Sequence, residues 1–331
     1  MIGNEAERTV AENYRRFALH EAHGRSPLYE QLALGVADDP ELVAFLEDRP
    51  ASKRQPNLLL ATVRYLAGLP SDRAALRDVV LGRRDEVAAT MRARRTQTNE
   101  PARCATLLPA LAQIDGPLAL LEVGASAGLC LLPDRYGYHY RRADGGDVHI
   151  AGSPLLTCEV RGPAPLPSRA PKVVWRAGID LEPLDVADPD DLRWLACLLW
   201  PGEEGRAERL DAAAAVARAD PPRVVRGDLV DDLHALADQA PPDATLVVFH
   251  SAVLAYVPTA RRAAFAEAVG ELGAVWLANE AAAVLADLPH PPPADLPAPP
   301  PGPTPSLLVR DGHRPSAWVD GHGTWLQWLD G

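Results

Sequence analysis

The sequence predicts an α/β fold, in which an N-terminal α-helical domain precedes a Rossmann-like core with a mostly parallel sheet and a closing antiparallel hairpin. Residues 5–116 show the apolar periodicity of helices, and from residue 118 short apolar strands alternate with helical stretches. The first of these strands runs into a turn of small residues, Gly124 to Gly128, where a ligand can approach the backbone. We therefore expect a helical domain over residues 1–116 and the core over 117–331.

In the first domain, apolar spacing and breaking residues delimit the helices. Asp38-Asp39-Pro40 and Gly68-Leu69-Pro70 interrupt the pattern, and the polar segment 96–101 ends in Pro101 and predicts a loop. Beyond a first apolar face at residues 10–19, the expected helices are 28–37, 40–47, 57–67, 72–95 and 102–113.

In the second domain, apolar runs predict the strands. The parallel strands are expected at 118–123, 173–176, 223–226, 245–250 and 274–278, and the closing strands at 306–309, 317–319 and 325–329. Residues 137–172 interrupt this alternation and predict an inserted β-hairpin or lid. Residues 289–305 are rich in proline and predict a stiff loop.

Composition excludes several classes of function. The net charge is -12, and the whole excess lies in residues 117–331, which hold 17 basic and 29 acidic side chains. This argues against a nucleic-acid partner. No apolar run reaches the length of a membrane span. Glu5, Glu7 and Glu12 take the place of a signal peptide's apolar region, so we expect a cytoplasmic protein.

Cysteine and histidine usage bounds the chemistry further. The four cysteines are scattered, with no CxxC, which favours reduced thiols. Among the nine histidines, His20 and His23 lie close in sequence, but no third ligand stands at metal spacing. We therefore expect no metal.

The turn after the first strand fits more than one chemistry. Gly124-Ala125-Ser126-Ala127-Gly128, with Glu122 before it, fits the glycine-rich loop of class I S-adenosylmethionine (SAM) methyltransferases. It also fits G-x-S-x-G, the nucleophile elbow of serine hydrolases, with Asp228 and His250 or Asp287 and His322 as partners. A plain strand-turn-helix connection is the third interpretation. Because about 115 helical residues precede the turn, the cofactor loop is favoured.

Two later strands end in acids. Asp180 follows the strand Val174–Ile179, at roughly the spacing of a ribose-binding acid once the insertion is removed; the alternative is an ordinary helix cap. Gly227 and Asp228 follow another strand and suit an adenine amino group, or again a helix cap. With the turn, these residues make up the predicted cofactor site: Glu122, Gly124, Ala125, Ser126, Gly128, Asp180, Gly227 and Asp228.

Three residues are candidates for work on a substrate. His250 ends the central strand, where a neutral imidazole could take a proton from a hydroxyl or an amine. Tyr256 and Glu280 lie beyond the ends of neighbouring strands and are reserve candidates. The alternative for His250 is a structural histidine with its ring nitrogens hydrogen-bonded.

The order of these residues resembles an actinobacterial family with a methyltransferase-like core, domain of unknown function 2332. The matching segments cover nearly the whole chain: Gln97–Glu100, Glu122–Leu129, Asp134–Tyr136, Arg176–Asp180, Trp200-Pro201, Gly227-Asp228, His250-Ser251 and Glu280. The chain departs from the family at Cys130, where asparagine is common. The resemblance implies a class I methyltransferase-like fold and, by analogy, SAM as the cofactor.

The sequence therefore predicts a SAM-dependent methyltransferase that acts on a small molecule. The alternatives are a serine hydrolase that uses Ser126 and a non-catalytic nucleotide- or SAM-binding protein. The methyl acceptor and the oligomeric state are not predicted.

Overall fold

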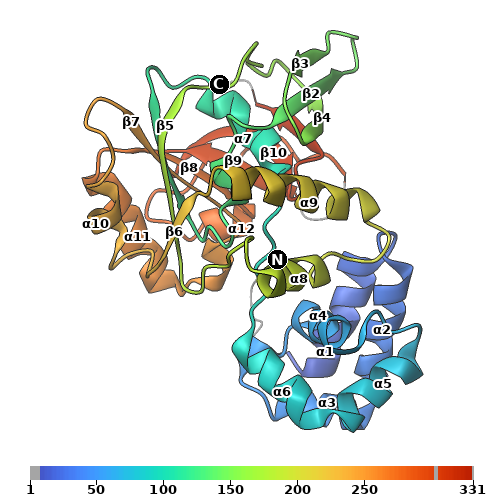
Figure 1. Cartoon of the computed structure of the whole chain (residues 1–331). Coiled ribbons are helices and arrows are strands. Elements are labelled where there is room, and N and C mark those ends of the chain that lie inside the picture. The colour runs from blue at the N-terminus through green and yellow to red at the C-terminus, as the bar shows by residue number, and fades with distance from the viewer. Residues whose placement is uncertain (1–7, 302–304, 330–331) are drawn as a thin grey trace. The chain divides into compact units, whose positions relative to one another are not determined.

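A computed structural model describes residues 8–301 and 305–329, and the chain divides into two compact units. The first contains the described residues up to Thr98 together with Asp188–Glu208, and the second contains Asn99–Ala187 and the rest from Arg209 (Figure 1). The sequence predicted one boundary, at residue 116. Glu5, Glu7 and part of the proline-rich loop, 302–304, lie outside the described residues.

The first unit is helical, as predicted. Its elements are α1 (Val10–Phe17), the π-helix η2 (Ala18–Ala22), α2 (Pro27–Asp38), α3 (Pro40–Glu47), the 3-10 helix η3 (Ala51–Lys53), α4 (Pro56–Ala67), α5 (Arg73–Gly82), α6 (Arg84–Ala93), α8 (Pro189–Cys197) and the first turn of α9 (Glu204–Ala219). The helix predicted over 72–95 is two helices, because Arg83 leaves helical geometry at φ -121°.

Side-chain caps explain where several helices begin. Ser26 accepts from the backbone N–H of Tyr29, and Asp39 accepts from those of Glu41 and Leu42. A proline follows each cap at the first helical position, where its missing N–H costs no hydrogen bond. Asp188 caps α8 in the same way.

Apolar and ionic contacts hold residues 188–208 within the first unit. The Trp200 ring packs edge-on against Phe17, with 5.2 Å between centroids, and Trp194 packs against Tyr65. Arg94 pairs with Asp191 at 2.7 Å. These partners lie 97 to 183 residues away along the chain, so local sequence patterns could not predict this grouping.

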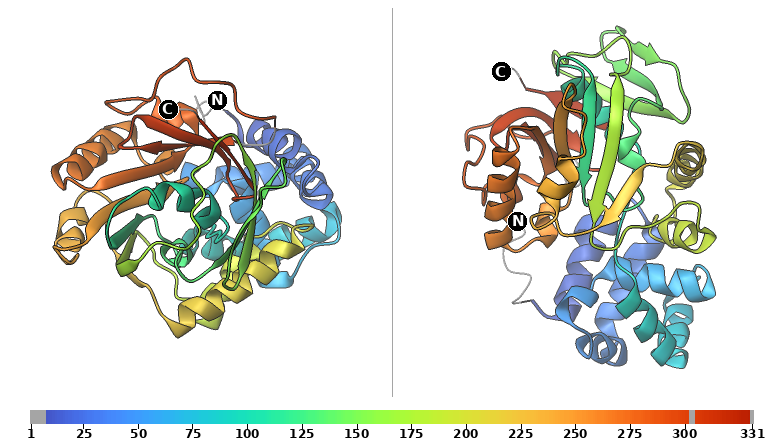
Figure 2. Two further views of the ribbon diagram at one scale, coloured as in Figure 1. Left: turned by 90° about the horizontal axis from the view of Figure 1, so that it is seen from above. Right: turned by 60° about the vertical axis from the view of Figure 1, so that its left-hand side comes forward.

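The second unit is built on one mostly parallel sheet of eleven strands, in the order β3-β2-β4-β11-β10-β9-β8-β7-β1-β5-β6. The strands are β1 (Leu118–Val123), β2 (Gly137–Arg142), β3 (Val148–Ile150), β4 (Leu155–Arg161), β5 (Val173–Asp180), β6 (Arg223–Arg226), β7 (Thr245–Ser251), β8 (Val275–Glu280), β9 (Pro305–Arg310), β10 (Arg314–Asp320) and β11 (Trp325–Trp328). Figure 2 (right) shows β1, β5 and β6 side by side.

Helices cover the sheet. They are α7 (Arg103–Leu111), the remainder of α9, α10 (Leu233–Ala237), α11 (Thr259–Glu271) and α12 (Ala282–Leu285), with the 3-10 turns η4 (Leu129–Leu131) and η5 (Leu254–Tyr256). One buried cluster joins Val123, Val248 and Ala278 of the strands to Phe265 of α11 and Leu285 of α12. These two helices therefore cover the face of the sheet to which those strand residues point.

The predicted insertion is part of the sheet. Its first two strands, β2 and β3, form the expected antiparallel hairpin. The third, β4, pairs in parallel with β2 on one side and with β11 on the other. The predicted closing strands are confirmed as the antiparallel set β9, β10 and β11, and through them the insertion joins the parallel strands in one sheet.

Candidate functional site

The order of the parallel strands reverses at β1. Apart from the insertion, the chain runs from β1 outward to β5 and β6 and then returns to β7 and β8 on the other side of β1. In open α/β sheets, ligands bind where the strand order reverses in this way. The loops that follow β1 and β7 therefore form the candidate site.

The turn after β1 is tightly wound. Gly124, Ser126 and Gly128 have φ values of +68°, +52° and +71°, in the left-handed region. The N–H groups of Gly124 and Ala125 donate to the carbonyl of Ile179 on the neighbouring strand, at 2.8 and 3.2 Å. A serine rarely adopts a positive φ, and such backbone strain concentrates at functional sites.

The small residues of the turn are also required by packing within the chain. A Cβ on Gly124 would lie 2.5 Å from the side chain of Val253, in the loop after β7. One on Gly128 would lie 2.8 Å from the Pro222 ring. Val253 thus closes one side of the turn, and its loop lies directly beside the loop after β1.

Asp180 holds the turn in place. Its Oδ2 accepts from the Ser126 N–H at 2.8 Å, and its Oδ1 accepts from the Glu182 N–H at 2.9 Å. The sequence predicted that this acid binds a ribose, with a helix cap as the alternative. The structure shows that its carboxylate bonds the backbone of the glycine turn.

Glu122 lies beneath the turn and is 4% exposed. Burial raises its pKa well above the ordinary value, Cys130 and Asp180 raise it further, and the Arg103 guanidinium opposes them. Arg103 itself donates to the carbonyls of Ser251 and Gly321.

Three buried polar atoms gather on one face of the strand ends. Glu122 pairs with Phe249, and Ser251 pairs with Asn279, so the side chains of Glu122, Ser251 and Asn279 point to the same face. Within the described residues, Glu122 Oε2, Ser251 Oγ and Asn279 Oδ1 are buried without a hydrogen-bond partner. Because buried polar atoms are nearly always satisfied, these three indicate a place for a water or a ligand.

His250 and Glu280 point to the opposite face. His250 Nδ1 lies 2.7 Å from Glu280 Oε1, and the Trp276 indole N–H donates to His250 Nε2 at 3.0 Å. Because Nε2 accepts a hydrogen bond, the proton of the neutral ring is on Nδ1 and is donated to Glu280. Glu280 Oε1 also accepts from the N–H groups of Val253 and Leu254, at 2.8 and 3.1 Å.

This network engages both nitrogens of a fully buried His250 ring. The geometry therefore favours the structural alternative for His250 and makes Glu280 the anchor of the loop after β7. Tyr256, on η5, is 69% exposed. The predicted roles of these three residues in catalysis are not tested by their positions.

Gly227 and Asp228 begin a turn over residues 229–231 and do not cap a helix, since α10 starts only at Leu233 after its N-cap Asp232. Asp228 Oδ1 accepts from the N–H of Val230 at 2.8 Å, and its carboxylate pairs with Arg261. Partial burial acts to raise its pKa, but backbone N–H bonds and Arg261 lower it overall. A Cβ on Gly227 would lie 2.9 Å from the Asp232 carboxylate, which explains the glycine.

Sequence reasoning missed the partners that fix the approach to the turn. Asn99 Oδ1 accepts from the Leu129 N–H at 2.9 Å, and Cys130 Sγ donates to the Glu100 carbonyl at 3.4 Å. Glu100 is 2% exposed and pairs with Arg209 at 2.8 Å. The sequence signals were the polar segment 96–101, which we predicted as a loop, and the family resemblance over Gln97–Glu100.

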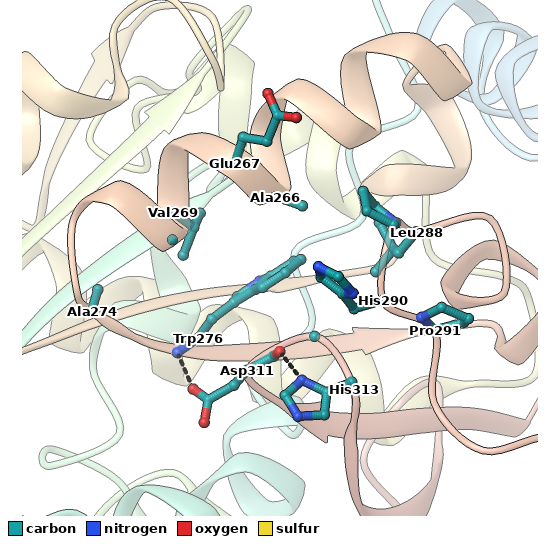
Figure 3. A pocket seen from close by; sticks show the side chains of 13 residues that line it. Ala266, Glu267, Val269, Ala274, Trp276, Leu288, His290, Pro291, Asp311 and His313 are labelled. Carbon is teal, nitrogen blue, oxygen red and sulfur yellow. Dashed lines mark hydrogen bonds between the residues drawn. The ribbon is translucent and has the colours of Figure 1, made fainter.

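A separate cavity of about 770 Å³ lies at the amino end of β8 (Figure 3). Trp276, Leu288 and His290 line it, together with Asp311 and His313 of the β9–β10 turn. His313 Nδ1 donates to the Asp311 carbonyl at 2.7 Å. Trp276 is thus shared between this cavity and the buried His250 network.

Among the helices in the described ranges, none combines the length and hydropathy needed to cross a membrane. No curated protein and no solved structure matches the chain. One family model, described as "Uncharacterized protein conserved in bacteria (DUF2332)", matches residues 11–328. Because this match spans almost the entire sequence, the chain belongs to the DUF2332 family.

Proposed function

We propose that the second unit binds S-adenosylmethionine at the carboxyl ends of β1, β5 and β7 and transfers its methyl group to a small molecule. The observation that carries the proposal is the set of buried, unpartnered atoms on Glu122, Ser251 and Asn279, beside a strained glycine turn at the point where the strand order reverses. Counted along the chain without the insertion, β6-β5-β1-β7-β8 has the order 3-2-1-4-5 of a nucleotide-binding sheet.

The residues present fit this cofactor. Asp180, which ends β5 beside the turn, is the acid that would accept the ribose hydroxyls. Glu122 Oε2 would accept from the cofactor's ammonium group, and that positive charge would offset the burial that raises the pKa of Glu122. The cofactor supplies a methyl group on a sulfonium, so the protein needs mainly to align the acceptor.

In this proposal, His250 does not act as a general base. Taking up a further proton would place two N–H donors, from His250 and Trp276, against each other. Tyr256 is the exposed candidate for contact with the methyl acceptor. A protein that binds the cofactor without turnover would use the same residues.

The test is calorimetric titration of the protein with SAM, S-adenosylhomocysteine and NAD. We expect heat with the first two and none with NAD. Glu122→Gln keeps the shape of the side chain and should weaken SAM binding by roughly tenfold or more, as for loss of a charged hydrogen bond. The matched control is Glu267→Gln, at an exposed carboxylate of α11, which should bind like the wild type. Absence of heat with both SAM and S-adenosylhomocysteine at millimolar concentration would refute the proposal.

The positive φ of Ser126 is the one observation that favours the hydrolase alternative, because a nucleophile elbow is strained. Three of its four predicted partners are engaged elsewhere: Asp228 pairs with Arg261, Asp287 pairs with Arg262, and His250 bonds Glu280. A fluorophosphonate probe distinguishes the two activities. We expect no labelling, whereas stoichiometric labelling that Ser126→Ala removes would replace the methyltransferase proposal with the hydrolase.

A further inference from the structure

We propose that the β2–β3 hairpin binds a divalent transition-metal ion such as Zn²⁺ through His139, Asp147 and His149. The donor atoms of the three side chains all lie within 4.8 Å of one another. This site is independent of the proposed cofactor site, and it differs from the expectation of no metal.

The strand register produces the cluster. His139 lies opposite His149 in the antiparallel pair. Their neighbours, Tyr138 and Ile150, point to the buried face, so the two histidines share the outer face. The rings stack with centroids 4.0 Å apart. The sequence signal that could have found this is the matching alternation Tyr-His-Tyr and Val-His-Ile on either side of a turn.

The hairpin turn supplies and orients the carboxylate. Asp147 Oδ1 accepts from the Arg142 N–H at 2.9 Å, and Oδ2 lies 3.0 Å from His139 Nε2. The turn is held by the Gly145 N–H, which donates to the Arg142 carbonyl at 3.1 Å, and by the Gly146 N–H, which donates to Asp144. One oxygen thus fixes the carboxylate while the other faces the rings, which is the arrangement of a supported metal ligand.

The distances suit a small metal ion. Ligand atoms at 2.0–2.1 Å from a tetrahedral Zn²⁺ are about 3.3 Å apart. His139 Nε2 and Asp147 Oδ2 are already 3.0 Å apart, near this value. A ring nitrogen of His149 lies within 4.8 Å of the donor atoms of the other two side chains, and rotation of this exposed side chain can bring it closer.

The donor set selects the class of metal. Two imidazoles and one carboxylate suit zinc, copper, nickel and iron, whereas Mg²⁺ and Ca²⁺ take oxygen ligands. The nearby guanidinium groups are already paired, Arg141 with Glu159 and Arg142 with Asp144, so they do not impose an uncompensated charge on the ion. Three protein ligands leave at least one coordination position for water.

Binding would join a short edge strand to its neighbour. β3 has three residues and lies at the edge of the sheet. An ion held by His149 on β3 and His139 on β2 would cross-link the two strands beside their turn. Amide exchange in β3 should therefore slow when the metal is bound.

The experiment is calorimetric titration of the metal-free full-length protein with Zn²⁺, with Mg²⁺ and Ca²⁺ as separate titrants. We expect one Zn²⁺ per chain and no heat from the other two. His149→Ala should weaken Zn²⁺ binding by roughly tenfold or more, since one of three protein ligands is lost. Its matched control, His313→Ala, removes an exposed histidine from another hairpin and should bind like the wild type.

Two further measurements keep the test decisive. Circular dichroism should show that both variants fold, since both histidines are exposed. X-ray absorption at the zinc edge should show nitrogen and oxygen neighbours. Absence of Zn²⁺ binding to the wild type at millimolar concentration, equal affinity in His149→Ala, or sulfur ligation by the cysteines would each overturn the proposal.

Discussion

Replacing Glu280 by alanine should destabilise the second unit by about 3–5 kcal/mol, the usual cost of breaking a buried charged network. In the structure, one oxygen of Glu280 accepts from three groups: His250 Nδ1 at 2.7 Å, the Val253 N–H at 2.8 Å and the Leu254 N–H at 3.1 Å. An unsatisfied buried donor costs about 1–3 kcal/mol, and donors that share one acceptor do not add independently.

Urea denaturation followed by circular dichroism measures this cost. Glu280→Gln keeps an acceptor oxygen in the same place and should lose only about 1–2 kcal/mol. Glu267→Ala, on the exposed surface of α11, should change stability by less than about 0.5 kcal/mol. If Glu280→Ala costs no more than the exposed control, the carboxylate does not anchor the loop after β7, and Glu280 again becomes a candidate for catalysis.

The remaining predictions concern the turn and its surroundings. Burial raises the pKa of Glu122 above its unfolded value of about 4.3. The stabilisation from the protonated carboxyl is therefore fully present below that pH and is lost as the pH rises toward the folded pKa. When urea denaturation is repeated from pH 4.5 to 8, Glu122→Gln should become more stable relative to the wild type. Arg176 forms a two-pronged ion pair with Asp134 at 2.8 and 2.9 Å, so Arg176→Lys should cost about 2–3 kcal/mol, and a loss below 0.5 kcal/mol, typical of exposed pairs, would contradict this. Gly128→Ala should cost about 2 kcal/mol or more in the same assay, because the new Cβ would clash with Pro222 in addition to straining a positive φ. Gly273→Ala is the control, since Gly273 also has a positive φ but has open space around a new Cβ. Equal losses of stability in the two variants would show that the clash with Pro222 is unimportant.

Local patterns predicted much of the fold because they reflect local physics. The apolar run Leu118–Val123 is buried along its whole length and forms the central strand β1, as expected. Asp39 and Pro40 begin a helix where a cap precedes proline. The parallel pairing of β4 with β11 could not be predicted in this way, because it joins residues more than 160 positions apart and depends on the register of both strands.

The candidate site also has features that local sequence predicts and features that depend on distant residues. The glycine turn and the acids at the strand ends follow from sequence, since each lies directly after an apolar run. The environment of His250 does not, because its ring partners belong to β8, 26 and 30 residues further along. The same pattern that suggests a base at a strand end also fits a buried histidine, and only the side-chain packing distinguishes them.

The position of β11 has a consequence for synthesis. β11 lies between β4 and β10, so without it the other ten strands separate into the set β3-β2-β4 and the set from β10 to β6. Translation completes β2, β3 and β4 more than 160 residues before it reaches Trp325. During translation, β4 therefore has an unpaired edge, which can pair with wrong partners until β11 is synthesised. A ribosome-bound chain halted before Trp325 should consequently depend on chaperones far more than the released protein.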